Sequence, residues 1–321
     1  MDSSSLDEVD QRIVQELRRD GRAPFSQIAH GAGVSEHTVA RRYRRLRERG
    51  LRVSGQLIPQ YVGLTRWLLR LNCTPAASAK IADALARRTD TSWVQIASGG
   101  TELNCAVDIR SARERDALLL DKLPHTPRVV SVSAHCLLHI FGTTPEDTPP
   151  APDTHPGSTP APGKPAHPVV GTVELDSVDH KLLSALAHDG RSTLPELAEA
   201  TGRSAAGISR RLERLRTSGA LLFVVDIDPE LLGQQMLVRL WLRIAPGALG
   251  AVGRALAAHP QIPFAAATTG PSNLVATGHF ADAYQLYRYL DHELGTLPGV
   301  QSIETAPILR DVKRLTHGTP S

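Results

Sequence analysis

The sequence has little cysteine and no long apolar run, and both shortages limit what the protein can be. Its 321 residues include only Cys73, Cys105 and Cys136, which lie far apart without a C-x-x-C pair. Three scattered thiols form no disulfide framework, so we expect them to be buried, small apolar side chains. No apolar stretch approaches the about 18 residues that cross a bilayer, and the polar start does not resemble a signal peptide. We therefore expect a cytoplasmic protein with no membrane partner.

The sequence also lacks the short motifs that mark common enzymes. It contains no Walker, G-x-S-x-G or H-E-x-x-H motif and no cluster of carboxylates. These motifs supply phosphate cradles, activated nucleophiles and metal ligands. We therefore predict no catalytic residues, no metal site and no cofactor.

Proline is concentrated in one place. Residues 145–168 read PEDTPPAPDTHPGSTPAPGKPAHP, with nine prolines and almost no apolar bulk. Such a segment buries too little surface to offset the entropy of ordering, and we interpret 145–172 as a linker. At about 3.1 Å per residue, its 24 proline-rich residues would span on the order of 70 Å.

The segments on either side of the linker repeat each other. Adding 169 to a residue number maps LDEVD at Leu6 onto LDSVD at Leu175, and DGR at Asp20 onto DGR at Asp189. Later positions match with a shift of 171, which maps Gly99 onto Gly270. The chain is therefore a tandem duplication of one unit, and each unit should fold alike.

Each unit begins with helices and continues with alternating strands and helices. Apolar residues at a spacing of 3.6 predict a first helix, residues 26–32 predict a second, and Ser35 after Gly33 caps a third. The rest predicts strands at 67–73, 93–97, 103–109 and 129–140 and helices at 78–88 and 112–123, and the second copy repeats this over 237–308. The order β-α-β-β-α-β indicates an α+β fold with a ferredoxin-like sandwich in each unit.

The third helix is unusually basic. Residues 34–50 read VSEHTVARRYRRLRERG, and six arginines against two glutamates give a net charge of +4, whereas the whole chain has +3. Val39, Tyr43 and Leu46 form one helical face, and Arg41 and Arg45 lie on the opposite face. A short helix, a glycine turn and a capped basic helix form the order of a helix-turn-helix, whose second helix enters the DNA major groove. The alternative is an ordinary basic surface helix.

We predict that this helix and its copy contact DNA through guanidiniums and short polar groups. The candidate residues are Ser35, His37, Thr38, Arg41, Arg42, Arg44 and Arg45 in the first copy, and Ser204, Arg210, Arg211 and Arg214 in the second. The second helix begins with Ala205, Ala206 and Gly207, which offer little base readout. We therefore expect Arg41→Ala to lose discrimination between operators and Arg211→Ala to weaken binding to all DNA about equally.

These motifs resemble the Lrp/AsnC (feast/famine) family of bacterial and archaeal transcriptional regulators. The resemblance rests on LDxxDxxIxxxLxxDGR at Leu6, on GVSEHTVARRYRRLRERGL at Gly33 and on the sandwich with its glycine turn, in both copies. It implies winged-helix-type DNA-binding domains, each joined to an effector domain that dimerises through its sheet. The expected segments are 1–60 (helix-turn-helix), 61–144 (effector domain), 145–172 (linker), 173–230 (helix-turn-helix) and 231–315 (effector domain).

The resemblance also implies a small-molecule effector, usually an amino acid or related metabolite. The family turn reads Gly-x-x-Asp-Leu, and this chain departs from it in both copies. Exposed turn amides can hold a carboxylate, Glu102 could pair with an ammonium group, and neutral Asn273 could only hydrogen-bond one. An ordinary turn without a ligand remains the alternative. The candidate effector residues are Gly99, Gly100, Thr101 and Glu102 in the first copy, and Gly270, Ser272 and Asn273 in the second.

Duplication suggests how the chain binds its operator. Relatives with one unit form homodimers that place two helices about 34 Å apart on a palindrome. Here one chain supplies both halves, so we expect a covalent pseudo-dimer that prefers an imperfect palindrome of double-stranded DNA. Further assembly into homo-oligomers is expected from the resemblance.

Two other functions remain open. Siroheme decarboxylases of haem biosynthesis resemble the same family, include fused two-unit proteins, and need histidines and arginines around a large pocket. The histidines available for such a pocket are His125, His135, His139, His259, His279 and His292. No two of them are equivalent under the 171 shift, and His135 and His139 lie about 13 Å apart on one strand, too far to share a metal. A non-regulatory binding or assembly module is the third interpretation.

Overall fold

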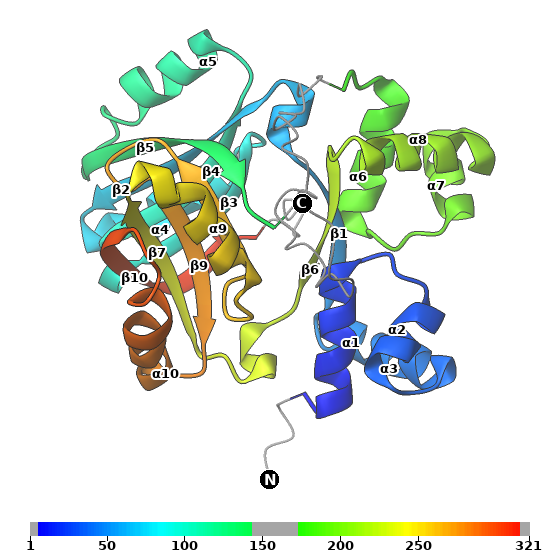
Figure 1. The fold of residues 1–321 in the computed structure, drawn as a ribbon. Helices are drawn as coiled ribbons and strands as arrows, with labels where there is room; N and C mark the ends of the chain where they lie inside the picture. Colours follow the sequence, from blue (N-terminus) through cyan, green and yellow to red (C-terminus); the bar gives the residue numbers. More distant parts are fainter. Residues whose placement is uncertain (1–5, 143–172, 315–321) are drawn as a thin grey trace, which may run out of the picture.

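The computed structural model describes residues 6–142 and 173–314, so the predicted linker at 145–172 lies outside the described residues. Two three-helix units stand beside a barrel of strands, and a two-stranded ribbon runs between the helices and the barrel (Figure 1). In the described part of the chain, no helix is long and apolar enough to cross a membrane.

The two helical units confirm the predicted helix-turn-helix. The first helical unit contains α1 (Glu8–Arg19), α2 (Phe25–Ala32) and α3 (Glu36–Glu48); the second contains α6 (Ser177–His188), α7 (Leu194–Thr201) and α8 (Ala205–Thr217). The turn between the last two helices is made by Gly33 and Gly202, which both have φ of 68°. A left-handed residue at this position ends a helix sharply, and glycine adopts it without strain.

The ribbon exchanges strands between the two copies. Strand β1 (Arg52–Leu57) pairs antiparallel with β6 (Leu221–Asp226). Leu57 from the first copy packs into the core of the second helical unit, and Ile227 from the second copy is buried in the core of the first. Each helical core is therefore completed by a residue of the other copy, so the predicted segments 1–60 and 173–230 share their cores.

Each copy then forms the predicted β-α-β-β-α-β order. The first has strands β2 (Thr65–Cys73), β3 (Thr91–Ala97), β4 (Glu102–Ile109) and β5 (Val129–Ile140) with helices α4 (Pro75–Ala86) and α5 (Ala112–Asp116). The second has β7 (Met236–Ile244), β8 (Phe264–Thr268), β9 (Leu274–Phe280) and β10 (Val300–Lys313) with α9 (Leu249–Ala258) and α10 (Ala283–Arg288).

The two sheets join edge to edge into one closed barrel. Strand β5 pairs with β8 and β10 pairs with β3, so the order around the barrel is β10-β3-β4-β2-β5-β8-β9-β7. Alternate residues face opposite sides: Leu240 and Leu242 pack under α9, whereas Trp241 between them joins the barrel interior. Closure removes the open sheet edges, which are otherwise sites of aggregation.

Two local features differ from the sequence-based expectation. The helix expected at 112–123 is α5 followed by a π-helical segment, Ala117–Lys122, and the second copy has the same arrangement in Tyr289–Leu294. Hydrophobic periodicity does not distinguish these two helix types because both bury one face. Cys73 and Cys105 are buried as expected, but Cys136 is only half-buried.

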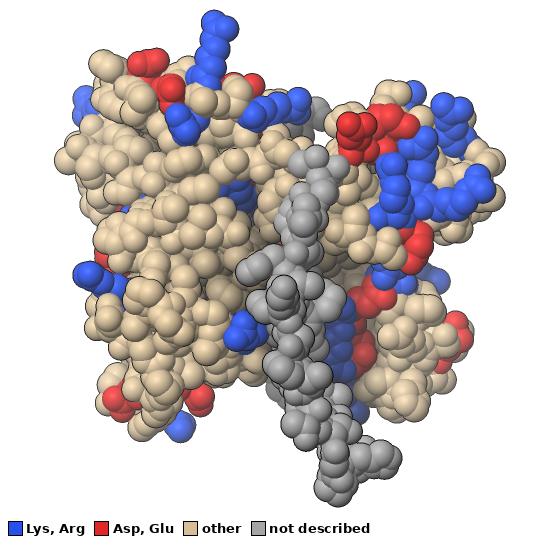
Figure 2. All heavy atoms as spheres, turned by 45° about the horizontal axis from the view of Figure 1, so that its top comes forward, with Lys and Arg blue, Asp and Glu red and all other residues tan. Residues whose placement is uncertain are grey.

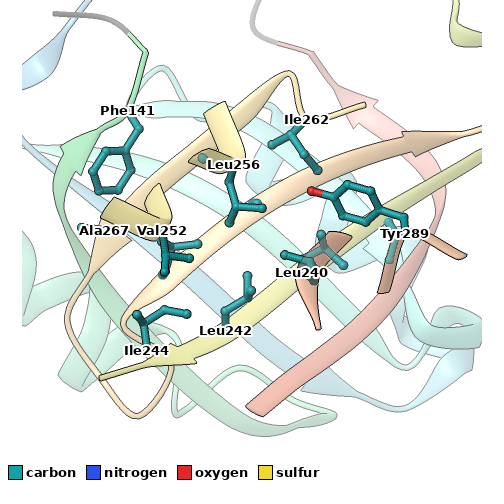
Figure 3. Packing of buried hydrophobic residues seen from close by; sticks show 14 of the residues in the cluster. Phe141, Leu240, Leu242, Ile244, Val252, Leu256, Ile262, Ala267 and Tyr289 are labelled. Carbon is teal, nitrogen blue, oxygen red and sulfur yellow. The ribbon is translucent and has the colours of Figure 1, made fainter. Parts of the chain in front are cut away.

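The core of the second sandwich includes one residue from the first copy. Phe141, which follows β5, packs among Val252 and Leu256 of α9 and the side chains of β7 (Figure 3). Gly253 makes room for it, because a Cβ atom there would lie 2.2 Å from two carbons of the Phe141 ring.

We expect Gly253→Ala to destabilise the fold despite a gain in helix propensity of about 1 kcal/mol. Overpacking typically costs about 1–3 kcal/mol, and the buried ring has little room to move. The free energy of unfolding, measured with urea, should fall by about 2 kcal/mol. Gly247→Ala is the matched control because nothing lies within 4 Å of that position. Equal stabilities of the two variants would refute this packing.

Candidate nucleic-acid interface

Helices α3 and α8 lie on the side of the ribbon away from the barrel (Figure 1). Each begins with a serine cap: Thr38 N donates to Ser35 Oγ at 3.2 Å, and Gly207 N donates to Ser204 Oγ at 3.3 Å. These contacts fix the start of each helix, which is the part that approaches base edges in a helix-turn-helix. His37 is exposed there, and Thr38 is half-buried.

Four of the seven predicted DNA-contacting arginines instead hold their own unit together. In the first helical unit, Asp10 is fully buried and accepts from Arg42 Nη1 at 2.8 Å and from Arg45 Nη2 at 2.5 Å. Arg42 also donates to Asp7, which lowers the pKa of that carboxyl. A buried carboxylate is stable only when it is paired, so these contacts fix α3 against α1.

The second helical unit repeats this arrangement. Asp179, 1% exposed, accepts from Arg211 Nη1 at 2.9 Å and from Arg214 Nη2 at 2.6 Å. Sequence reasoning missed these acceptors, although the second aspartate of LDxxD, present in both copies, was the signal. Arg211 is therefore a structural residue here, and its substitution no longer isolates a contact to DNA.

The arginines that remain free point to the interface. Arg41 and Arg44 in the first unit, and Arg203 and Arg210 in the second, are exposed, and their guanidiniums form no hydrogen bond or ion pair with the described residues. Arg203 was not predicted, because it precedes the helix at a position where the first copy has Val34.

The second unit offers a basic concavity. Lys and Arg side chains gather over this unit in Figure 2. An open cavity of about 500 Å³ is lined by Asp176, Arg203, Ser204, Gly207, Arg210, Arg211 and Arg214. Four guanidiniums against one carboxylate at a helix N-terminus suit a phosphate group.

We predict that Asp179→Asn destabilises the second unit. The amide cannot accept two charged hydrogen bonds as the carboxylate does, and a charge-assisted bond contributes about 1.5–3 kcal/mol. Because Arg214 is 48% exposed and can be rehydrated, we expect a loss of about 2 kcal/mol in urea unfolding. The control is Glu8→Gln, whose exposed side chain should change stability by less than about 0.5 kcal/mol. A loss no larger than the control's would contradict the role of Asp179.

Two arginines clamp the helical units to each other. Arg22 Nη1 and Nη2 donate to the carbonyl oxygens of Gly190 at 2.6 Å and Ser192 at 3.0 Å. Reciprocally, Arg191 donates to the carbonyl oxygens of Gly21 at 2.8 Å and Ala23 at 3.0 Å. Both arginines belong to the repeated DGR motif, so one motif supplies the clamp from both sides.

Further contacts strengthen this clamp. The Arg191 guanidinium lies 5.0 Å from the Phe25 ring centroid, and that of Arg22 lies 5.6 Å from Phe223. Arg47 and Asp189 form an ion pair of 2.8 Å between the units. The relative position of α3 and α8 is therefore set by direct contacts as well as by the ribbon.

The first predicted effector turn uses its acidic side chain internally. Glu102 is 2% exposed and accepts from Arg70 Nη2 at 2.9 Å and from Asn104 Nδ2 at 2.9 Å. Arg70 also bonds Glu304 of the second copy, which raises the arginine's pKa. Gly99 and Gly100 have φ of 69° and 85°, and Thr101 donates to Ser98 O at 2.7 Å. The carboxylate is thus occupied and the Thr101 amide donates to Ser98 O at 3.3 Å, so the exposed backbone of Gly99 is what the turn offers a ligand.

The second turn is also pinned to the sheet. Asn273 Oδ1 accepts from Ile244 N and its Nδ2 donates to Ile244 O, both at 2.8 Å. The Ser272 carbonyl accepts from Thr268 Oγ1 at 3.0 Å. Gly270 has φ of 106°, and a Cβ atom there would lie 2.4 Å from His135 Nδ1. Both turns therefore use polar side chains for structure, with different partners in the two copies.

The histidines do not converge. His135 contacts the Trp241 ring in a tilted arrangement and bonds Thr269 O at 2.8 Å, whereas His259 bonds the Tyr289 hydroxyl at 2.9 Å. Burial lowers the pKa of His279 to about 4. Among the described residues, no group of three or more His, Cys, Asp or Glu is placed to hold a metal ion.

Known proteins share both the sequence and the fold. Residues 6–47 and 175–216 match the AsnC-type helix-turn-helix domain, and residues 237–317 match the Lrp/AsnC ligand binding domain. The HTH-type transcriptional regulator FL11 of Pyrococcus horikoshii is 33% identical over 146 residues, 45% of this chain and 96% of that protein. The regulator LrpA of Mycobacterium tuberculosis is 41% identical over 63 residues, 19% of this chain and 42% of that protein.

Two solved structures of one protein are similar over nearly the whole chain. The siroheme decarboxylase NirDL has a TM-score of 0.61 and 14% identity, covering 96% of this chain and 93% of that one. At this identity the similarity concerns the fold, including the duplication, and not the reaction. The sequence comparisons instead match this chain to transcriptional regulators. The matches include both helix-turn-helix copies and the ligand-binding domain. The chain therefore belongs to the Lrp/AsnC family of helix-turn-helix transcriptional regulators.

Proposed function

We propose that the chain is a sequence-specific regulator that binds one DNA duplex with both helical units, as a covalent pseudo-dimer. The observation that carries this proposal is the reciprocal clamp of Arg22 and Arg191, which holds two basic helices in one fixed pair. Two fixed helices match two half-sites at one separation, so the operator should be a palindrome. It should be imperfect because α3 and α8 present different residues.

We assign different tasks to the two helices. His37 and Arg41 of α3 are exposed and able to reach base edges, and an arginine fork suits guanine O6 and N7. Helix α8 begins with two alanines and a glycine, while Arg203 and Arg210 surround a concavity suited to phosphate. The first helix therefore carries most base readout, and the second mainly anchors the backbone.

The DNA proposal is tested by selecting genomic fragments with the purified protein at about 150 mM salt, where non-specific binding is weak. We expect a small set of enriched fragments that share an imperfect palindrome. Equal recovery of all fragments, also at low salt, would reject sequence-specific binding.

We also propose that a small metabolite, an amino acid or a related compound, controls DNA binding. The support is the match of residues 237–317 to a ligand-binding domain. At the two predicted turns, exposed backbone at Gly99 and Gly270 is what a ligand carboxylate would meet. The different partners of Glu102 and Asn273 favour unequal binding at the two turns. Assembly of several chains is part of this proposal.

A siroheme decarboxylase is the second candidate, and the fold similarity to NirDL favours it. The separated histidines and the basic helices weigh against it, and we propose a protein without catalytic activity. Adding siroheme to the purified protein and recording its visible spectrum separates the two functions. An unchanged spectrum of free siroheme supports the regulator, whereas a bound spectrum followed by decarboxylated product would establish the enzyme.

A further inference from the structure

A cavity lies where the second helical unit meets the barrel. It has a volume of about 350 Å³ and is open on one side. Its walls come from α6, from strand β1 and from barrel strands β2, β3, β4 and β10, together with the segment that joins β1 to β2. The apolar part of the lining includes Leu57, Leu64, Leu183 and Ala187, and Arg66, Thr91 and Lys313 contribute polar groups.

The duplication explains why there is room. At the corresponding junction of the other half, α1 carries Arg18 where α6 has Ala187, and β6 carries Asp226 where β1 has Leu57. The charges of Arg18 and Asp226 interact with each other there. Replacing this pair by alanine and leucine removes a long side chain and its partner. The second junction therefore has an apolar floor where the first has two opposite charges.

One buried polar atom beside this floor lacks a partner among the described residues. Thr91 is 2% exposed, and its hydroxyl forms no hydrogen bond with the described residues. The equivalent residue of the other copy is Ile262, which has no polar atom to satisfy. A buried hydroxyl without a partner is costly, which indicates a group that binds there.

Two cations face the same space. Arg66 uses Nε and Nη2 to bind Asp108, at 2.6 and 2.8 Å, and its Nη1 has no partner among the described residues. Lys313 Nζ donates one hydrogen bond, to Arg88 O at 2.9 Å. Asp108 is the acidic residue of the lining and already accepts from Arg66 and Ser92. The lining thus has a net positive charge.

We propose that this cavity binds a small aliphatic carboxylate, which links α6 to the barrel. The carboxylate would accept from Arg66, Lys313 and Thr91, and the aliphatic part would rest on Leu57, Leu64 and Leu183. The volume is within the range of pockets for small ligands. A 2-oxo acid fits better than the matching amino acid, because an ammonium group finds no free carboxylate. The regulatory consequence rests on the proposed function: a ligand that bridges the junction fixes the second helical unit relative to the barrel.

Isothermal titration calorimetry of the full chain with 4-methyl-2-oxopentanoate and with L-leucine tests this proposal. We expect the oxo acid to bind with a Kd of about 1 mM or tighter and leucine to bind at least about tenfold more weakly. Ala187→Arg restores the residue of the other junction and should abolish binding. The control is His188→Arg, which adds the same charge at the next, exposed position and should bind as the wild type does.

Thr91→Val keeps the shape of the side chain and should weaken binding about tenfold, a loss typical of one buried hydrogen bond. This second variant keeps the test decisive if Ala187→Arg does not fold. No binding to the wild-type protein, or equal binding by the wild type and both cavity variants, would overturn the proposal.

Calorimetry is done without DNA, so its result is separate from the proposed function. Binding of the oxo acid by a protein that selects no DNA would refute the regulator and retain the cavity. Specific DNA binding without oxo-acid binding would refute the cavity alone.

Discussion

Replacing both Arg22 and Arg191 with alanine is expected to lower operator affinity by about 100-fold, or about 2.7 kcal/mol. Each guanidinium donates two hydrogen bonds to carbonyl oxygens of the other helical unit. A charge-assisted bond contributes about 1.5–3 kcal/mol, and stacking on Phe25 or Phe223 adds up to about 1 kcal/mol. Without the clamp, the two helical units must be ordered relative to each other before α3 and α8 can contact their half-sites. The free energy of this ordering must then come from DNA binding.

The control for this experiment is Arg19→Ala, which removes an exposed arginine that pairs within its own helix. It should reduce affinity by no more than about threefold, because surface ion pairs contribute about 0–1 kcal/mol. Affinities come from fluorescence anisotropy on the selected operator, and circular dichroism checks that the helices persist. If the double variant binds as tightly as Arg19→Ala, the clamp does not position the two units.

Arg41→Ala is expected to reduce discrimination between the operator and a point-mutated operator by about 10- to 100-fold, since one bidentate base contact contributes about 1–3 kcal/mol. Arg41 is exposed and free of partners among the described residues, so the variant should fold normally. The matched variant is Arg210→Ala at the equivalent position of α8. We expect it to weaken binding to the operator and to random DNA by a similar factor. The slope of the logarithm of the binding constant against the logarithm of the salt concentration should become smaller in magnitude by about 1.

The affinity of each of the two variants is measured for the operator, for mutated operators and for random DNA, at several salt concentrations. If both variants lose the same affinity for every DNA, base readout by α3 and backbone anchoring by α8 are not separate tasks. Loss of discrimination by Arg210→Ala alone would reverse the two tasks. Arg211 is unsuitable for this comparison because it binds the buried Asp179.

Local patterns in the sequence were enough to predict the repeat, the helix-turn-helix and the β-α-β-β-α-β order. These features depend on spacing within short segments, such as Val39, Tyr43 and Leu46 on one helical face. The glycine turn at Gly33 and the cap at Ser35 are equally local.

Contacts between distant segments could not be predicted in this way. A helical wheel places Arg42 on α3 but does not show that Asp10, 32 residues earlier, lies within 2.8 Å of it. The same applies to Glu102: the sequence suggests that its charge can bind a ligand, but it does not show that the carboxylate accepts a hydrogen bond from Arg70. Strand exchange and barrel closure depend on which sheet edges meet. The cavity depends on Ala187, which stands at the junction of the second helical unit and the barrel where the first copy has an arginine.

The central claim is that one chain holds two DNA-binding helices at a fixed separation. It is tested most directly by measuring affinity for the selected operator and for versions with about 5 or about 10 base pairs inserted between the half-sites, half and one helical turn of DNA. We expect one preferred separation, with a loss of affinity of at least about tenfold for either insertion in the wild-type protein and a smaller loss in the Arg22→Ala, Arg191→Ala double variant. Equal affinity of the wild-type protein for all three operators would contradict it.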